Sequence, residues 1–342
     1  MQLKHILVIR VSAMGDVAMT VPVLKQLLEQ YPHLHITVLT QGFLAPIFAP
    51  LERTTIKAIE TKGRHKGLPG LLRLFRELKS EQTFDAVADL HNVLRSSIIS
   101  LLFRTSGVKI ATIDKGRSEK KKLTARTNKQ LVPLKTSFQR YADTFAALGL
   151  PVQLDYSIAP YEKMPLPASA ERLFLSRKKH ICIAPFAKHR EKMYPAGKMK
   201  AVIQQLLLRP EFQLFLLGGG KEEKNILEEW VAAMPGVTNL AGRFNFSEEL
   251  AILSRMDLVL SMDSANMHLA SLFGVPVVSI WGATHPFAGF YGWGQEPGNA
   301  VQTDLFCRPC SVFGNKPCYR GDHACMVGLP QEWVMEKVVE KS

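Results

Sequence analysis

Cysteine is scarce in this sequence, and long hydrophobic runs are missing from it. Five cysteines among 342 residues are too few for a small secreted scaffold held together by disulfides. No apolar stretch approaches the 18 or so residues that a membrane-spanning helix requires. The four-residue apolar run before Arg10 is too short for a secretory signal. We therefore expect a cytoplasmic protein, or one at the cytosolic face of a membrane.

Compositional bias is also lacking. Hydrophobic residues make up 46% of the chain and charged residues 21%, which excludes a disordered tail, a collagen and a coiled-coil rod. At 342 residues the chain exceeds the size at which a single hydrophobic core usually stops growing. We therefore expect two domains.

Negative charge is in deficit, mainly in the first half. The net charge is +13, and residues 1–160 carry 23 Lys and Arg against 12 Asp and Glu, whereas residues 161–342 carry 20 against 18. This asymmetry predicts an anionic partner, such as a phosphorylated substrate or an acidic membrane surface; a solvated basic face is the alternative. We expect no nucleic acid, because no helix-turn-helix, zinc-finger or aromatic-interleaved pattern accompanies the charge.

Strand-length apolar runs alternate with helix-length periodic segments along the whole chain. This alternation predicts an α/β fold with parallel sheets. Four prolines between residues 151 and 167 indicate a linker, because proline restricts both its own backbone and that of the preceding residue. We expect two Rossmann-like domains facing a cleft, over residues 1–160 and 161–342. The expected strands are Lys4–Val11, His35–Thr40, Asp85–Leu90, His180–Pro185, Phe212–Leu217, Leu258–Ser261 and Val277–Trp281, and the expected helices include Val17–Gln30 and Gln331–Lys341.

The segment Ser12–Asp16 lies at the turn between the first expected strand and helix. Ligands bind at such turns in open α/β sheets. Gly15 permits close backbone approach, and Asp16 is a candidate general base, although an Asp there can also simply cap the helix. Because the turn holds a single glycine, it matches neither the dinucleotide fingerprint nor a Walker A loop.

Three loops at strand ends in the second half carry further candidates. The cations of Lys188–Lys192 could neutralise phosphates on a leaving group. The glycine turn Gly218–Gly220, followed by Glu222, could approach a ribose. Asp263–Ala265 opens a helix whose start suits a diphosphate, with His268 one turn along. The alternatives are a loop, a helix cap and a core-facing histidine.

Four of the five cysteines cluster near the carboxyl end, at Cys307, Cys310, Cys318 and Cys325. Their spacing allows a tetrahedral structural zinc site in a reducing compartment. Reduced thiols or a labile disulfide are the alternatives.

Four segments together resemble the ADP-heptose:lipopolysaccharide heptosyltransferase family (glycosyltransferase family 9). The segments are Val8–Val17, Asp89–Arg95, Asp263–His268 and Trp281–Pro286. The resemblance spans nearly the whole chain in matching order. It implies a GT-B architecture and an inverting transfer of heptose from ADP-heptose to the lipopolysaccharide inner core, with no cofactor or metal needed for catalysis. It also implies an anionic lipid A–Kdo type glycolipid acceptor, and a peripheral location at the inner leaflet of the inner membrane.

The resemblance also implies a role for individual residues. Asp16 would deprotonate the acceptor hydroxyl, Lys192 would stabilise the departing ADP diphosphate, and Glu222 would hold the ribose. The remaining donor-binding residues would be Lys188, Gly219, Asp263, Ser264, Ala265 and His268. The acceptor-binding residues would be Gly15, Arg64, Lys66, Arg95 and Arg117.

Three other functions stay open. Ala265 stands where members of the family often have glycine, which leaves room for a different nucleotide-sugar donor. An NAD-linked oxidoreductase would require a glycine fingerprint followed about 20 residues later by an acidic residue, and the first turn lacks it. A non-catalytic protein could use the basic half to bind a membrane surface or nucleic acid.

Overall fold

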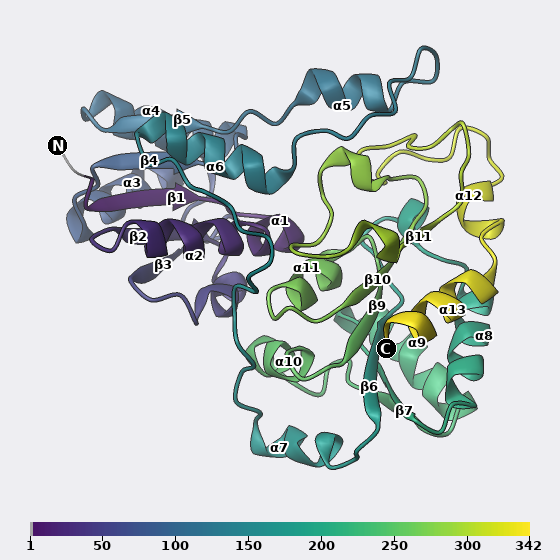
Figure 1. Cartoon of the computed structure of the whole chain (residues 1–342). Helices are drawn as coiled ribbons and strands as arrows, with labels where there is room; N and C mark the ends of the chain where they lie inside the picture. The colour runs from purple at the N-terminus through teal and green to yellow at the C-terminus, as the bar shows by residue number, and fades with distance from the viewer. Residues whose placement is uncertain (1–2) are drawn as a thin grey trace. The chain divides into compact units, whose positions relative to one another are not determined.

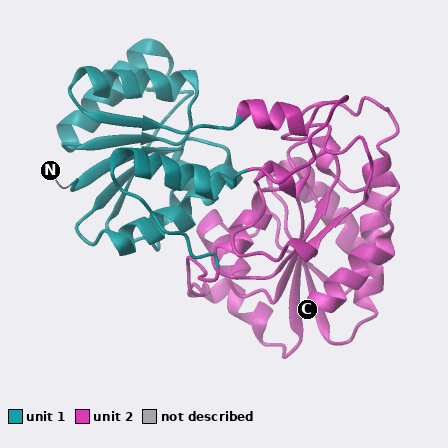
Figure 2. Cartoon of the chain, turned by 45° about the horizontal axis from the view of Figure 1, so that its top comes forward, with its two compact units in different colours: residues 1–116, 135–156 teal, residues 117–134, 157–342 magenta. Residues whose placement is uncertain are grey.

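The computed structural model describes residues 3–342, which form two units (Figure 1 and Figure 2). Unit 1 comprises the chain through Gly116 together with Lys135–Tyr156. Unit 2 comprises Arg117–Leu134 together with Ser157–Ser342. The last crossing, between residues 156 and 157, lies within the proline-rich stretch expected to be a linker. Residues 117–134, expected in the first domain, are grouped with unit 2.

Unit 1 is built on a parallel sheet with the strand order β3-β2-β1-β4-β5. The strands are β1 (His5–Ile9), β2 (His35–Thr40), β3 (Thr54–Ala58), β4 (Ala86–Asp89) and β5 (Lys109–Thr112). Residues 6–9 of β1 are fully buried, because a central parallel strand is covered on both faces. The chain order reverses between β1 and β4, so the loops after these two strands are where a ligand is expected to bind.

Helices cover the sheet of unit 1. Helices α3 and α4 pack against each other, and apolar residues from both join the core formed with β1, β2 and β4. Helices α2 and α6 lie side by side (Figure 1). The helical elements are α1 (Met14–Ala18), α2 (Thr20–Gln30), η1 (Gly42–Phe48), α3 (Gly67–Glu81), α4 (Leu94–Thr105) and α6 (Ser137–Leu148).

The prediction of a single helix over residues 17–30 is wrong, because the chain forms two helices that meet at Met19. Pro22 lies in the first turn of α2 and has no amide hydrogen to continue a helix from α1. The hydroxyl of Thr20 donates to the carbonyl of Val17 at 2.7 Å. The break leaves α1 as a short helix that carries Asp16.

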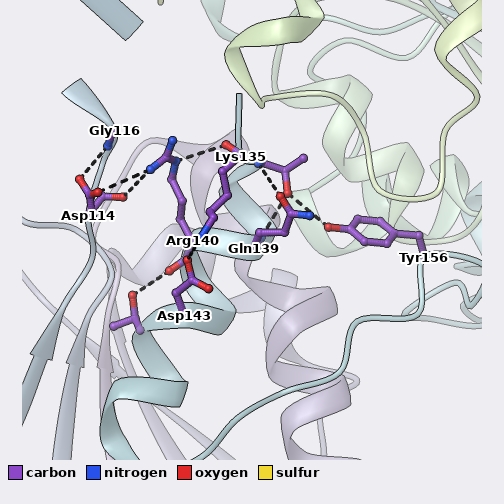
Figure 3. Close-up of polar contacts among 9 residues, drawn as sticks. Asp114, Gly116, Lys135, Gln139, Arg140, Asp143 and Tyr156 are labelled. Carbon is purple, nitrogen blue, oxygen red and sulfur yellow. Dashed lines mark hydrogen bonds and ion pairs between the residues drawn. The ribbon is translucent and has the colours of Figure 1, made fainter. Parts of the chain in front are cut away.

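Arg140 of α6 holds together the two ends of the excursion that leaves unit 1 after Gly116 and returns at Lys135. Its Nε donates to the carbonyl of Lys135 at 3.2 Å, and its Nη1 donates to the carbonyl of Asp114 at 3.3 Å. Figure 3 shows this guanidinium between Asp114 and Lys135. Gly116 has a positive φ of 57°, and a Cβ there would overlap the Arg140 guanidinium. The excursion itself contains α5 (Arg117–Leu123).

Unit 2 is built on a six-stranded parallel sheet with the order β11-β10-β9-β6-β7-β8. Its strands are β6 (Lys179–Ala184), β7 (Phe212–Leu216), β8 (Val237–Asn239), β9 (Leu258–Met262), β10 (Val277–Trp281) and β11 (Ala300–Gln302). The chain order reverses between β6 and β9, which predicts a ligand site at the loops that follow these two strands.

The core of unit 2 is formed by apolar residues of β6, β7, β9 and β10 together with α8, α9 and α13. Helices α10 and α11 contact each other. The helical elements are α7 (Ala168–Glu171), η2 (Arg172–Phe174), η3 (Arg190–Lys192), α8 (Ala196–Leu207), α9 (Gly220–Ala233), α10 (Phe246–Leu253), α11 (Ala265–Ser271), η4 (Pro286–Ala288), η5 (Pro297–Asn299), α12 (Ala324–Val327) and α13 (Gln331–Lys341).

The prediction of two Rossmann-like α/β domains is confirmed. All seven expected strands are present, and the terminal helix spans the expected residues. Four strands were not expected, namely β3, β5, β8 and β11. Between residues 3 and 342, no helix combines the length and the apolar character needed to span a membrane.

Candidate functional site

Asp16 occupies the first turn of α1, directly after the loop that follows β1. Its Oδ2 lies 2.5 Å from Nη2 of Arg10 and accepts a hydrogen bond from the amide of Ala13 at 3.3 Å. Asp16 is therefore not the N-cap that the alternative interpretation proposed. Ala13 is the N-cap, and Asp16, as the third residue of the helix, accepts a hydrogen bond from the N-cap amide. Its side chain is still 29% exposed, and within residues 3–342 its Oδ1 makes no hydrogen bond. That second oxygen is available to accept a proton.

Arg10 is a site residue that the sequence analysis missed. Its guanidinium is buried and donates from Nη1 to the carbonyl of Leu90 at 2.6 Å. Burial alone would lower the pKa of Arg10, but Tyr141, Asp16 and Asp89 raise it. A cation directly after a buried apolar strand was the available signal, because a buried charge is retained only when it is paired.

The loop after β4 places a second buried polar group in unit 1. Oδ1 of Asp89 accepts hydrogen bonds from the amides of His91 and Asn92, at 2.9 and 2.8 Å. Burial, together with the positive charges of Arg10 and Lys115, lowers the pKa of His91 to about 4. The imidazole is therefore neutral at physiological pH.

The four cations expected to bind the acceptor lie in different elements. Arg64 and Lys66 are exposed ahead of α3, and Arg64 pairs with Glu77. Arg95 is half-buried in α4, whereas Arg117 is exposed at the start of α5 and belongs to unit 2. No hydrogen bond or ion pair of the described residues joins any two of them. Gly15 precedes Asp16 within α1.

In unit 2, an ion pair joins two of the predicted motifs. Nζ of Lys192, at the end of η3, lies 2.9 Å from Oδ2 of Asp263, which directly follows β9. Both side chains are largely buried, at 15% and 7% exposure. Since β6 and β9 are neighbouring parallel strands, the loops that follow them meet at one edge of the sheet. The pair holds an ammonium group in place at that edge.

The residues after Asp263 open α11. Ser264 is the N-cap, but its hydroxyl lies 3.1 Å from that of Ser261 and does not cap the helix. Ala265 is the first helical residue, and His268 is buried in the same helix. All three expected residues therefore follow Asp263 closely, at the start of α11 and one turn along it.

A glutamate supports the glycine turn before α9. The amide of Gly219 donates to Oε2 of Glu223 at 2.7 Å. Burial raises the pKa of Glu223, the bond from Gly219 lowers it, and the charge of Glu222 raises it further. Glu222 itself is exposed in the first turn of α9, and Lys188 is also exposed. Glu223 thus supports the turn, which leaves the carboxylate of Glu222 open to solvent.

The four clustered cysteines do not form the zinc site that their spacing allowed. All of them are free thiols. No group of three or more His, Cys, Asp or Glu in residues 3–342 is arranged to hold a metal ion. Burial raises the pKa of the Cys325 thiol to about 11.

Comparison with known proteins gives consistent results. A model of glycosyltransferase family 9 (heptosyltransferase) matches residues 71–315. The lipopolysaccharide core heptosyltransferase OpsX of Haemophilus influenzae is 26% identical over 299 residues, which cover 83% of this chain and 80% of that protein. Lipopolysaccharide heptosyltransferase 3 of Escherichia coli is 24% identical over 303 residues, or 84% and 85% of the two chains.

Solved structures share the fold. That of a glycosyltransferase family 9 protein from Veillonella parvula has a TM-score of 0.76 and 20% identity, with 99% of this chain and 98% of that one covered. E. coli heptosyltransferase WaaC with ADP-2-deoxy-2-fluoro heptose has a TM-score of 0.71 and 19% identity, with 99% and 100% covered. The expected GT-B-type architecture is confirmed.

The low pKa of His91 predicts a pH-dependent stability. An unfolded histidine has a pKa of about 6.5, whereas that of folded His91 is about 4. Between these values the unfolded chain binds more protons, so stability falls as the pH is lowered. We expect the melting temperature of His91→Gln to fall less than that of the wild type between pH 6.5 and pH 4. An equal fall in both proteins would show that His91 does not contribute. His285, whose pKa is also lowered to about 4 by burial and Arg308, allows the same measurement on unit 2 with His285→Gln.

Proposed function

Because the chain belongs to glycosyltransferase family 9, the heptosyltransferase family, we propose that this glycosyltransferase moves heptose from ADP-heptose to the lipopolysaccharide inner core. The names of the relatives, lipopolysaccharide heptosyltransferases, support heptose transfer to lipopolysaccharide. The ADP-heptose analogue bound in a structural neighbour supports ADP-heptose as the donor. Membership of this family replaces the oxidoreductase and the non-catalytic binder as explanations of the chain. A different nucleotide-sugar donor remains the second candidate, because Ala265 gives α11 a first residue other than glycine.

The Lys192–Asp263 pair carries the donor assignment. Departure of the nucleoside diphosphate develops negative charge on its bridging oxygen, and a fixed ammonium stabilises such charge best where water is excluded. Lys192 is largely buried, with its Nζ 2.9 Å from Asp263. The exposed Lys188 would add positive charge, and the exposed Glu222 would accept hydrogen bonds from the ribose. Gly219, Ser264, Ala265 and His268 complete the proposed donor-binding set of unit 2.

Asp16 would act as the general base in a single displacement. Its Oδ1 takes the proton of the acceptor hydroxyl while the hydroxyl oxygen bonds to the anomeric carbon. The bond from that carbon to the diphosphate oxygen breaks, and its electron pair leaves with ADP. One displacement inverts the anomeric centre. The step as written requires no metal ion, because Lys192 supplies the compensating charge.

We assign acceptor binding to the amino-terminal part of the chain. The anionic groups of a lipid A–Kdo type glycolipid would be met by Gly15, Arg64, Lys66, Arg95 and Arg117. The neutral imidazole of His91 and the buried Arg10 line the same strand ends as Asp16. In this scheme residues 1–160 provide the acceptor-binding domain and residues 161–342 the donor-binding domain.

A membrane-bound acceptor implies contact with the cytosolic face of the inner membrane. The excursion of residues 117–134 carries six cations and one anion. Arg117, Lys121 and Lys122 of α5 are exposed, as are the apolar side chains of Leu131 and Val132. Cations beside exposed apolar groups suit a surface of anionic headgroups. We propose that this segment takes part in peripheral membrane binding.

The donor proposal is tested by thermal shift with ADP, ADP-heptose, UDP-sugars, GDP-sugars and NAD. Binding to the folded state alone raises the melting temperature, so we expect stabilisation by ADP and ADP-heptose only. Lys192→Ala should reduce it, whereas truncation of the exposed Lys178 should not. Stabilisation by another nucleotide sugar would replace ADP-heptose as the donor, and stabilisation by NAD alone would contradict a transferase.

Replacing the proposed base should abolish catalysis without preventing donor binding. We expect Asp16→Asn to lower the transfer rate at least about 100-fold, while the protein keeps its thermal stabilisation by ADP. Glu29→Gln makes the same chemical change on the exposed face of α2 and should leave the rate unchanged. Normal transfer by folded Asp16→Asn would remove Asp16 from the mechanism.

The membrane proposal predicts salt-sensitive binding to vesicles. Phosphatidylglycerol vesicles should bind the protein, and phosphatidylcholine vesicles should not. Each well-placed cation contributes ~1 kcal/mol, so alanine at Arg117, Lys121 and Lys122 should weaken binding by about fivefold per residue. The matched control replaces the exposed Arg177, Lys178 and Lys179 of unit 2. Equal weakening by both triple variants would assign the effect to net charge alone.

A further inference from the structure

We propose that the cysteine-rich segment, residues 307–325, positions Lys192, and that Gly314 and His323 are its contact residues. This inference rests on the proposed role of Lys192 in donor binding. The segment carries the cysteine motif, but its described residues form no metal site. Three sets of contacts, all within unit 2, support a positioning role for it.

The segment is first fixed to the loop that follows β10. The buried guanidinium of Arg308 donates from Nε to the carbonyl of Gly282 at 2.5 Å and from Nη2 to that of Thr284 at 3.0 Å. The amides of Cys310 and Ser311 both donate to the carbonyl of Ala283, at 3.0 and 3.1 Å. A buried side chain with this many hydrogen bonds leaves the start of the segment little freedom to move.

Gly314 then packs on the stem of Lys192. The turn is held by a hydrogen bond from the amide of Gly314 to the hydroxyl of Ser311 at 3.0 Å, and Gly314 has a φ of +72°. A Cβ built on Gly314 would overlap Cγ and Cδ of Lys192. These atoms are in the middle of the side chain, so they cannot move aside without displacing the ammonium group that follows them. Only glycine lets the backbone come this close.

His323 holds the neighbouring residue from the other end of the segment. Its Nδ1 lies 2.8 Å from Oε2 of Glu191, whose side chain is 13% exposed. The carbonyl of Glu191 also accepts a hydrogen bond from the amide of Ala283 at 3.4 Å. The turn η3 that ends in Lys192 is therefore held at both its backbone and its Glu191 side chain.

The consequence is a preorganised ammonium group. A lysine has four rotatable bonds in its stem, and each must be ordered before the charge can meet a phosphate. Gly314 restricts the stem and Asp263 the ammonium, so the ordering is complete before the donor arrives. Because catalytic charge stabilisation depends on placement within a fraction of an ångström, the segment acts on catalysis through Lys192.

Gly314→Ala and Gly321→Ala form a matched pair. Both glycines lie in the segment and have positive φ angles, +72° and +79°, so alanine strains both turns alike. A Cβ at Gly321, however, meets no atom within 4 Å. We expect Gly314→Ala to lower kcat/KM for the donor by about tenfold or more and to weaken ADP binding, with KM for the acceptor unchanged. Gly321→Ala should stay within about twofold of the wild type.

A double variant separates positioning from general destabilisation. If the segment acts through Lys192, Gly314→Ala should cost nothing further in the Lys192→Ala background. Additive losses would overturn the proposal. So would equal activity of the two glycine variants alongside an impaired Lys192→Ala, although the proposed function would stand. An unimpaired Lys192→Ala would refute the role of the lysine itself, and with it the positioning proposal.

The His323 contact gives an independent test should Gly314→Ala fail to fold. We expect His323→Ala to lower donor kcat/KM and His323→Asn to restore most of it. The amide nitrogen of asparagine can occupy the position of Nδ1, and asparagine tolerates the φ of +47° found at His323. Equal loss in both variants, or loss in neither, would show that the bond to Glu191 does not position Lys192.

Discussion

Lys192 and Asp263 are both almost removed from water, and neither charge would be stable there alone. The strand order of unit 2 makes the pair possible, because β6 and β9 are neighbours that end at the same edge of the sheet. Unit 1 also contains an ion pair at the ends of its strands, but the supporting charge has the opposite sign. There the buried cation, Arg10, supports the carboxylate of Asp16, and in unit 2 the carboxylate supports the cation. In both units the ion pair orients the group to which we assign a chemical role.

The central strands of both sheets were predictable because they are buried on both faces and therefore read as continuous apolar runs. The four strands that were missed are the edge strands of the two sheets. They are β3, β5, β8 and β11, and several of their residues are exposed or polar. Packing against a neighbouring strand stabilises them, which local sequence does not encode. Local sequence likewise could not show that residues 117–134 belong to unit 2, because their partners lie more than 150 residues further along the chain.

The site was predictable to the extent that its residues follow strands. Asp16 and Asp263 lie where a Rossmann-like fold places ligands, and the pattern identified both loops. The pairing of Lys192 with Asp263 depends on strand order, which the sequence does not state. The support of the glycine turn by Glu223 was not predicted, because it depends on which side chain reaches the amide of Gly219. The cysteine spacing left a metal site, reduced thiols and a labile disulfide all open, because sequence separation does not say whether thiols are arranged as metal ligands.

The excursion of residues 117–134 makes each unit discontinuous in sequence. The chain crosses between units three times, after Gly116, Leu134 and Tyr156. Within unit 2, Lys129 donates to the carbonyls of Cys307 and Pro309, and Lys120 lies 4.4 Å above the ring of Phe290. Consider a hybrid of two homologous proteins with a single junction at the proline-rich linker. It would take residues 117–134 from one parent and the part of unit 2 that they contact from the other. Residues 117–134 must therefore be exchanged together with the carboxyl-terminal half, although 22 residues of unit 1 separate the two in the sequence.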